Sequence, residues 1–417
     1  MSTQERRAIV IGGGVIGASS AYYLTKQGWS VTILEQNQFA SGCSHGNCGY
    51  VSPSHVLPLA APGVLWPTLR TLFQRNSPLK LRLQFDPALW SWLLRFSRKC
   101  NAQDMHVAAG GIAALLNSSR TLYDQLFSQE PFDCEWETRG LLFVFHSQRG
   151  MDHYAETDQI LRTSYNMGAI RYDGSALTDL EPALKPGCAG AWLYPRDAHL
   201  RPDKLMSEWR KILTARGVTI REGCKFLTFG RHGRKVTSVE SSGGSHPADA
   251  VVVATGAWTP LLAHQLQFHV PIVPGKGYSL TMPRPERCPT YPMIFEEHRV
   301  AITPMRTGYR IGSTMEFAGY DTRLNPNRLG LLRAGAAFYL HDPFAAPVQE
   351  EWWGWRPMIY DGKPVIDFSP AYENVLIAAG HGMLGLSMSP GTGKLAAELL
   401  TGVQTHINPR PYSLARF

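Results

Sequence analysis

The sequence predicts an α/β fold built on a dinucleotide-binding unit of strand, turn and helix near the N-terminus. An apolar run at 8–11 is typical of a strand buried on both faces. Gly12, Gly14 and Gly17 follow in the spacing G-x-G-x-x-G and open a helical pattern. A second apolar strand then ends at Glu35, at the offset where a ribose hydroxyl needs an acceptor.

Each residue of this motif has a physical role. Gly12 permits a tight turn, Gly14 lets backbone approach a pyrophosphate, and Gly17 lets the helix pack close to the strand. The helix directs unpaired N–H groups and its positive dipole end at the same pyrophosphate. A glycine turn of an unrelated α/β protein is the alternative, but strand, helix and acid together favour dinucleotide binding.

The composition indicates a globular protein of about two domains. The chain has 417 residues, of which 44% are hydrophobic and 18% charged. The first residues leave no room for a signal peptide, and no apolar run is as long as a membrane span. Seven cysteines, an odd number, indicate reduced thiols. Cys43 and Cys48 flank a glycine-rich loop, but no matching Cys or His pair at zinc spacing appears elsewhere. We therefore expect a cytoplasmic protein without a metal site.

A net charge of +8 is compatible with nucleic-acid binding, with anionic lipid or simply with solubility. Much of this charge lies at 66–99, where Trp, Phe and Leu alternate with Lys and Arg and Asp86 is the single acid. Such a segment is typical of a helix in a membrane interface, and equally of an amphipathic helix packed on its own domain. Both interpretations remain open. Nothing resembles a nucleic-acid reader, so we expect no nucleic-acid partner.

A loop of small residues at 41–53 follows the ribose-binding acid, where backbone can lie against a flat or phosphorylated ligand. Ser44 and Asn47 are candidates to bond a phosphate or a ring edge, the alternative being a surface turn. His45 raises the further alternative of a covalent histidyl link to a flavin. The spacing from His45 to Gly49 does not fit the motif associated with that linkage.

Hydrophobic periodicity and the positions of glycine and proline predict the other helices and strands. They are a strand at 140–145, helices at 105–126, 202–216 and 328–339, and buried strands at 248–254 and 374–379. The two buried strands stop at glycine turns, at Gly256 and in the loop 380–385. A final helix is predicted at 391–400, with an anion-stabilising N-terminus. Its Gly391–Lys394 stretch is not a P-loop, because Leu395 replaces the required Ser or Thr.

An arginine among tryptophans is the strongest candidate for substrate binding. Arg356 follows Trp352, Trp353 and Trp355 and precedes a proline. Lone arginines are usually solvated, but one enclosed by aromatic residues is more often an anion clamp, because its planar fork pairs bidentately with a carboxylate.

These motifs resemble the FAD-dependent D-amino-acid oxidase superfamily, and within it the bacterial D-amino acid dehydrogenases of small-subunit type. The resemblance covers nearly the whole chain. Its most specific parts are GGGVIG with Glu35, NCGYVSP at 47–53, APGV at 61–64, FQRNSPL at 73–79, KGYSLT at 276–281, WRPM at 355–358 and GHGMLG at 380–385.

The resemblance implies a Rossmann-like FAD-binding domain of three β/β/α layers and an α+β substrate domain with a large mixed or antiparallel sheet. The first would comprise 1–60, 180–265 and 350–417, and the second 61–179 and 266–349. Residues 55–100 would be a basic aromatic insertion facing a membrane or a quinone.

The resemblance also implies a non-covalent FAD and its contacts. The pyrophosphate would rest on Gly12, Gly14, Val15, Ile16 and Gly17, the ribose near Glu35 and Gln36, and the adenine on the backbone at Lys225. The flavin ring would be framed by Ser44, Asn47, Gly49, Gly256, Gly380, Gly382, Met383, Leu384, Gly385 and Leu386.

For the reaction, the resemblance implies that Arg356 grips the substrate carboxylate and that Tyr278 hydrogen-bonds it. His381 and the last helix would stabilise negative charge in the reduced ring. The imino acid would hydrolyse to a 2-oxo acid and ammonia, and the electrons would pass to a membrane quinone or another acceptor.

The sequence departs from the family pattern beside the expected site. Trp355, Ile359, Tyr360, Met383 and Leu386 replace residues that are common there. The preferred amino acid therefore stays open. D-proline or hydroxyproline dehydrogenases, glycine- or sarcosine-oxidase-like enzymes and a non-catalytic flavin-binding protein are the alternatives.

Overall fold

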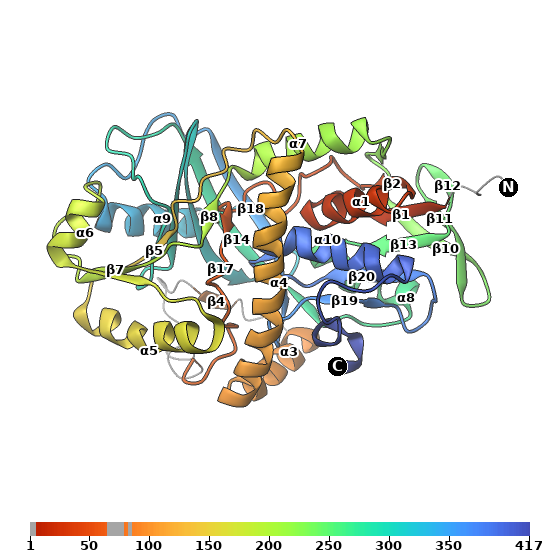
Figure 1. Ribbon diagram of the computed structural model, residues 1–417, viewed down its shortest axis with the longest axis horizontal. Coiled ribbons are helices and arrows are strands. Elements are labelled where there is room, and N and C mark those ends of the chain that lie inside the picture. The colour runs from red at the N-terminus through yellow and green to blue at the C-terminus, as the bar shows by residue number, and fades with distance from the viewer. Residues whose placement is uncertain (1–5, 65–78, 82–85) are drawn as a thin grey trace.

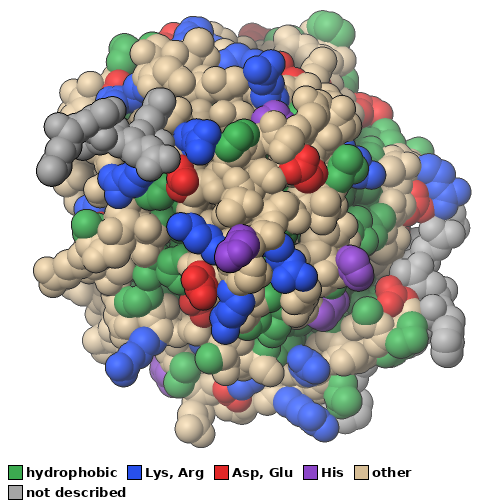
Figure 2. All heavy atoms as spheres, turned by 90° about the vertical axis from the view of Figure 1, so that its right-hand side faces the viewer, with side chains coloured by type: hydrophobic (Ala, Val, Ile, Leu, Met, Phe, Trp, Pro, Cys, Tyr) green, Lys and Arg blue, Asp and Glu red, His purple; other side chains and the backbone are tan. Residues whose placement is uncertain are grey.

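The computed structural model describes residues 6–64 and 86–417, together with the backbone of 79–81 (Figure 1). Within these residues the chain forms two main sheets with helices around them. No described helix combines the length and the apolar character that crossing a bilayer requires. On the face seen in Figure 2, Lys and Arg side chains are scattered among acidic ones instead of forming one basic patch.

The first sheet has six strands in the order β19–β20–β13–β1–β2–β9. Their bounds are β1 Arg7–Ile11, β2 Ser30–Leu34, β9 Thr219–Arg221, β13 Ala250–Val253, β19 Val365–Phe368 and β20 Val375–Ala379. All neighbouring pairs are parallel except β19 with β20. Parallel strands covered on both faces read as continuous apolar runs, which is why 8–11 and 250–253 could be predicted.

Two layers cover this sheet. Helices α1 Val15–Lys26, α7 Pro202–Ala215 and α10 Gly385–Thr401 share one core with Ala8 and Val10. The antiparallel strands β10 Phe226–His232, β11 Lys235–Ser241 and β12 Gly244–Pro247 cover the other face, where Phe229 and Val239 pack with Ile9 and Ile11. The predicted β/β/α layering is therefore confirmed.

The second sheet has nine strands, in the order β18–β14–β17–β16–β15–β5–β7–β6 with β4 also paired to β17. Their bounds are β4 Leu79–Leu81, β5 Leu141–Phe145, β6 Ile170–Asp173, β7 Gly190–Tyr194, β14 Ile272–Met282, β15 Met293–Phe295, β16 Val300–Met305, β17 Gly308–Phe317 and β18 Glu350–Ile359. Most pairs are antiparallel, while β15–β5 and β17–β4 are parallel. Helices α5 Gln148–Tyr165, α6 Gly174–Leu180 and α9 Pro326–Tyr339 belong to this part of the chain. The predicted large mixed sheet is confirmed.

Short elements connect the two parts. Strand β3 Tyr50–Val51 pairs with β8 Ala198–His199, and helix α8 Ala263–Leu266 follows the 3-10 turn η1 Gly256–Leu262. Two further 3-10 turns, η2 Arg410–Tyr412 and η3 Leu414–Arg416, lie near the end of the chain.

The predicted domain boundaries differ from this arrangement in three places. Strands β7 and β18 belong to the second sheet, although 180–265 and 350–417 were assigned to the FAD-binding domain. Helix α4 Ala102–Gln129 was assigned to the substrate domain, but Leu116 and Tyr123 pack in the core of α1 and α10. Pattern alone identifies an element but not the sheet it joins, which long-range packing decides.

The final helix begins earlier than predicted. α10 starts at Gly385 and not at Gly391, so Pro390 lies inside it. Proline removes one helical N–H, which normally ends a helix. Here the Leu386 carbonyl, which Pro390 leaves without its helical partner, accepts the Tyr123 hydroxyl at 2.7 Å and the Ser389 hydroxyl at 3.1 Å. The predicted anion-stabilising end at Gly391 is wrong, because that N–H is buried and donates to Ser119 Oγ at 3.0 Å.

Part of the basic aromatic segment can be described. Residues 66–78 and 82–85 lie outside the described part of the chain. Helix α3 Pro87–Lys99 is described; Asp86 caps it, and Trp92 is buried and donates its indole N–H to the Met358 carbonyl at 3.2 Å. The inner face of α3 therefore packs within the molecule. Trp90 and Leu94 are 47% and 54% exposed on its outer face.

A buried carboxylate near the short sheet gives a prediction about pH. Asp197 is fully buried and accepts both the hydroxyl and the N–H of Ser54, at 2.6 and 3.1 Å. Burial raises the pKa of Asp197 from 3.8 to about 7. The folded protein therefore holds a proton that the unfolded chain loses, and stability should fall as the pH rises from about 4 to 7.

Asp197→Asn should remove this fall, which is at most about 4 kcal/mol. Urea unfolding of both proteins at pH 5 and pH 8 measures the difference. We expect the variant to be more stable relative to the parent protein at pH 8 than at pH 5. A difference in unfolding free energy that is the same at both pH values would contradict the raised pKa of Asp197.

Candidate functional site

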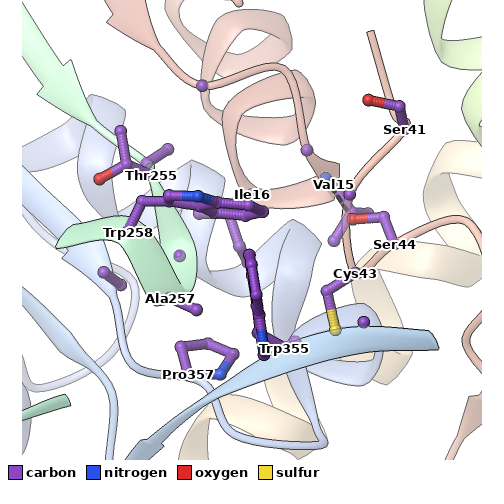
Figure 3. A pocket seen from close by; sticks show the side chains of 18 of the residues that line it. Val15, Ile16, Ser41, Cys43, Ser44, Thr255, Ala257, Trp258, Trp355 and Pro357 are labelled. Atoms are coloured by element: carbon purple, nitrogen blue, oxygen red, sulfur yellow. Dashed lines mark hydrogen bonds between the residues drawn. The ribbon is translucent and has the colours of Figure 1, made fainter. Parts of the chain in front are cut away.

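A cavity of about 570 Å³ lies at the carboxyl ends of β1, β2, β13 and β20, where they face β18 of the second sheet (Figure 3). This edge of a parallel sheet is where open α/β folds bind ligands. Each glycine turn predicted from the sequence reaches it. Its lining includes Gly12, Gly14, Val15, Ile16, Glu35, Gln36, Ser44, Asn47, Lys225, Gly256, Arg356, His381, Gly382, Met383, Gly385 and Leu386.

The first turn has the geometry that the motif requires. Gly12 has φ +110°, and a Cβ at Gly17 would lie 1.9 Å from the Gly12 carbonyl oxygen. Only glycine at both positions lets α1 approach β1 this closely. The predicted packing role of Gly17 is confirmed, and Gly17 itself does not line the cavity.

Two side chains are fixed beside this turn. Ser44 Oγ accepts the N–H of Val15 at 3.0 Å, so the 41–49 loop lies against the N-terminus of α1. Glu35 accepts the N–H groups of Gly13 and Asn37 at 2.8 and 2.9 Å, which fixes the carboxylate at the end of β2. The structure thus brings the glycines, Ser44 and Glu35 together, as predicted.

The predicted adenine contact at Lys225 stays a prediction. Lys225 lines the cavity; its N–H donates to Ser242 Oγ at 2.9 Å and its carbonyl accepts the Ser242 N–H at 2.8 Å. The carbonyl oxygen keeps a second lone pair that a ligand can use.

Arg356 reaches the other end of the cavity from β18. Its Nη1 donates to the Thr314 carbonyl at 2.6 Å. No Asp or Glu of the described residues pairs with it. Burial lowers the pKa of Arg356 below its ordinary 12.5, and the neighbouring Cys43 and Cys48 thiols oppose this shift only in part. Within the described residues the guanidinium charge therefore has no carboxylate partner, which leaves it available to an anionic ligand.

The space around Arg356 comes from a glycine that the sequence reasoning overlooked. A Cβ at Gly277 would lie 2.5 Å from Arg356 Cζ. Gly277 lies in the KGYSLT motif, so the motif itself carried the signal. In β17, Ser313 and Thr314 have φ +106° and +51°, next to an irregularity in the pairing with β14. A positive φ costs conformational energy in a β-branched residue such as Thr314. Thr314 is also the residue whose carbonyl accepts the hydrogen bond from Arg356.

The predicted contact between Tyr278 and the substrate is wrong in this structure. Tyr278 is buried in the core of the second sheet, and its hydroxyl donates to Glu316 Oε2 at 2.6 Å. Tyr278 pairs with Trp353 across the β14–β18 ladder, whereas Arg356 pairs with Gly275. Because side chains alternate along a strand, these two residues face opposite sides of the sheet.

Another arginine, the buried Arg310, fixes the loop that forms one wall of the cavity. Arg310 Nη1 donates to the carbonyls of His45 and Asn47 at 3.1 and 2.7 Å, and its Nε donates to Thr281. Nothing in the spacing of the sequence marks Arg310, because its partners are backbone carbonyls distant in the chain. Asn47 lines the cavity, and its Oδ1 accepts the Gly49 N–H at 2.7 Å.

Gly49 and His45 do not line the cavity. Gly49 has φ +83°, and a Cβ there would lie 2.0 Å from the Leu200 carbonyl oxygen, so it serves packing. His45 Nε2 lies 2.8 Å from Glu350 Oε1. This pairing turns the ring toward β18 and leaves the covalent histidyl link without support.

The loop after β20 forms the floor of the cavity. His381 is buried, with Nε2 2.9 Å from Thr392 Oγ1. Burial lowers the pKa of His381 from 6.5 to about 3, so the ring is neutral at physiological pH. Gly380 and Leu384 line a neighbouring crevice instead of the main cavity.

Aromatic rings form part of the cavity wall. Figure 3 shows Trp258 and Trp355 approaching each other in the cavity; their ring centroids lie 5.3 Å apart at 76°. Tyr320 packs against Trp355 at the same distance, and its hydroxyl donates to the Ala257 carbonyl at 2.7 Å. The Trp355 Nε1 is buried and has no acceptor in the described part of the chain. A dinucleotide with a flat polar ring fits a site with a glycine turn at one end and an unpaired indole N–H at the other.

Comparison with known proteins agrees with this site. The profile of the family described as FAD dependent oxidoreductase matches residues 7–399. The D-amino acid dehydrogenases of Granulibacter bethesdensis and Methylobacterium nodulans are each 33% identical to the chain, with 99% of both chains covered.

Solved structures share the fold. Glycine oxidase from Geobacillus kaustophilus has a TM-score of 0.80 at 22% identity, with 99% of each chain covered. L-proline dehydrogenase from P. horikoshii has a TM-score of 0.73 at 18% identity, covering 99% of this chain and 98% of that one. The chain therefore belongs to the FAD-dependent oxidoreductase family, and FAD is the cofactor that its cavity accommodates.

Proposed function

We propose that this protein is a dehydrogenase that converts D-amino acids to 2-oxo acids and ammonia. The observation that supports this most is Arg356, a partly buried cation on the cavity wall with no carboxylate partner among the described residues. A guanidinium pairs bidentately with a carboxylate, which every amino acid carries. The relatives named D-amino acid dehydrogenase, at 33% identity over nearly the whole chain, support the D-amino acid as substrate.

The side chains near Arg356 are suited to orient a substrate and not to exchange protons with it. Burial raises the pKa of the Cys43 thiol to about 11, so it stays protonated, and His381 stays neutral. Among the described residues that line the cavity, Glu35 is the only carboxylate, and it lies at the glycine-turn end. We infer that the substrate amine reacts as the free base while Arg356 fixes the α-carbon.

FAD, when bound, supplies the acceptor for the hydride of the α-carbon. The chain's own contribution is the electrostatic clamp at Arg356 and the tryptophan walls that exclude water. The imino acid then reacts with water to give the 2-oxo acid and ammonia.

Anaerobic bleaching of the bound flavin by matched D- and L-amino acids tests this proposal. We expect bleaching by D-isomers and not by their L-isomers. Bleaching by glycine or sarcosine, without any D-isomer, would instead indicate a glycine-oxidase-like enzyme. If no amino acid bleaches the flavin, the remaining interpretation is a non-catalytic flavin-binding protein.

A second candidate substrate class is the cyclic secondary amines, D-proline and D-hydroxyproline. The rings of Trp258 and Trp355 line the same cavity as Arg356 and narrow it, which favours compact substrates. Steady-state rates on D-alanine, D-proline and D-hydroxyproline, measured in one assay, distinguish the two classes.

The neutral His381 predicts the shape of the pH profile. Because burial lowers the pKa of this ring to about 3, it does not titrate between pH 5 and 9. The rate of flavin bleaching should rise with deprotonation of the substrate amine, with no inflection near pH 6.5. His381→Gln should change the rate by a constant factor at every pH. An inflection that the variant abolishes would show that His381 takes up a proton during the reaction.

We also propose that the electrons pass to a quinone, at the membrane face formed by the outer side of α3. Exposed Trp90 and Leu94 beside Arg95 and Arg98 support contact with an anionic membrane. Co-sedimentation with anionic and with neutral vesicles at low salt tests this. Trp90→Glu should abolish binding to anionic vesicles, and equal sedimentation with neutral vesicles or none at all would contradict the membrane contact.

A further inference from the structure

A second opening lies behind the loop that follows β20. It is a crevice of about 50 Å³, here called the Trp92 crevice. Its walls come from the 55–60 loop, from Trp92 and Phe96 of α3, from the end of β18 and from the 380–384 loop. Apart from two histidines and Tyr360, the side chains that line it are apolar or carry their polar group elsewhere, as the indole N–H of Trp92 does toward Met358.

The crevice and the main cavity share one wall. His381, Gly382 and Met383 line both spaces. The Met383 side chain is unbranched and flexible, so it can change position without rearranging the fold. Only this short stretch of loop therefore separates the Trp92 crevice from the FAD cavity.

One polar side chain in the crevice, that of His55, has no hydrogen-bond partner among the residues that the structure describes. The His55 ring makes no hydrogen bond within the described part of the chain, and its centroid lies 6.3 Å from that of Phe143. Burial lowers the pKa of His55 from 6.5 to about 4, so the ring is uncharged and carries one N–H donor. An uncharged donor among apolar walls suits a neutral ligand with a carbonyl oxygen.

The rim connects the crevice to an apolar and basic surface. Leu59 lines the crevice and is 43% exposed, while Arg95 lies over the Tyr360 ring at 5.8 Å. Exposed Trp90 and Leu94 continue along the same helix. An apolar molecule held at this surface would therefore meet the mouth of the crevice directly.

We propose that the Trp92 crevice binds the ring of a quinone acceptor, with His55 donating to a quinone carbonyl. This inference rests on the proposed dehydrogenase function, which requires an acceptor. The amino acid loses two electrons and two protons as its imino acid forms, and the quinone gains both to become a quinol. The volume of about 50 Å³ is too small for the ring at rest, so the ring enters when Met383 or Phe96 changes rotamer.

The experiment separates quinone oxidation from amino-acid oxidation. Holoenzyme is reduced with dithionite, which needs no substrate, and mixed in a stopped-flow instrument with a short-chain ubiquinone. We expect Ala60→Phe, which fills the crevice, and His55→Phe, which removes the donor, to slow flavin reoxidation about tenfold or more. Leu227→Phe on β10 is the matched control, because Leu227 is exposed and lines neither the crevice nor the surface around α3, and it should reoxidise at the parent rate.

Photo-crosslinking with an azido-ubiquinone gives a readout independent of turnover. The label is expected on peptides containing 55–60 or 89–96, and Ala60→Phe should remove it. Labelling within 353–357, or competition between the quinone and a carboxylate inhibitor, would place the acceptor in the amino-acid cavity and overturn the proposal. Unchanged reoxidation in both crevice variants would also overturn it.

The two proposals fail in distinguishable ways. If the dehydrogenase proposal fails, no D-amino acid bleaches the flavin, yet the dithionite-reduced protein still reports on the crevice. If only the crevice proposal fails, amino acids bleach the flavin normally and the crevice variants reoxidise like the parent.

Discussion

Arg356→Ala is expected to lower kcat/KM for D-amino acids about 10³-fold while the protein keeps its FAD. Removing one partner of a buried charge pair costs about 2–5 kcal/mol, and each factor of ten corresponds to about 1.4 kcal/mol. Arg356 lies at the proposed substrate end of the cavity, and among the described residues its hydrogen-bond partner is one carbonyl, that of Thr314. The measurement is the anaerobic bleaching rate against substrate concentration, with FAD content from the visible spectrum.

Two variants separate the loss of carboxylate binding from the loss of a positive charge alone and from the loss of an arginine elsewhere. Arg356→Lys keeps the charge but loses the planar fork, so we expect an intermediate loss, mainly in KM. Arg306→Ala removes an exposed arginine near the same sheet, which forms a surface ion pair with Asp133, and this variant should behave like the parent. A parent-like Arg356→Ala variant would remove the main support for an amino-acid substrate.

Gly17→Ala is expected to abolish FAD retention and to lower the melting temperature by 5 °C or more. The new Cβ would lie 1.9 Å from the Gly12 carbonyl oxygen, so α1 must move away from β1. That movement displaces the N–H groups that face the cavity at the start of the helix. A destabilisation of about 2 kcal/mol shifts the melting temperature of a large domain by several degrees.

The control is another glycine within a helix. Gly110 lies in α4, and a Cβ there meets nothing within 4 Å. Gly110→Ala should be neutral or stabilising, because alanine has the higher helix propensity. Yellow, FAD-loaded Gly17→Ala protein would show that close packing at this turn is not required.

The sequence was most informative where function depends on local geometry. The roles of Gly12 and Gly17 follow from one turn and its flanking elements, and the structure confirms them. Arg356 was identified by its aromatic neighbours, which are adjacent in the chain. In each case the signal and the contact lie within a few residues of each other.

Features set by pairing between distant strands were not predictable. The wrong role for Tyr278 depends on one step of register along β14, which decides the face of the sheet on which a side chain lies. The early start of α10 depends on the Tyr123 hydroxyl, supplied by another helix. Arg310 acts on backbone carbonyls more than two hundred residues away, a contact that spacing cannot reveal.

The left-handed backbone at Ser313 and Thr314 costs folding stability, and the same backbone positions the arginine proposed to bind the substrate. Glycine at either position would relax the chain, yet it would also free the peptide that aims the guanidinium. Selection for thermal stability alone should therefore accumulate substitutions at these two positions, and the resulting proteins should be more stable but less active. Engineering for industrial deamination should leave this dipeptide untouched and seek robustness elsewhere.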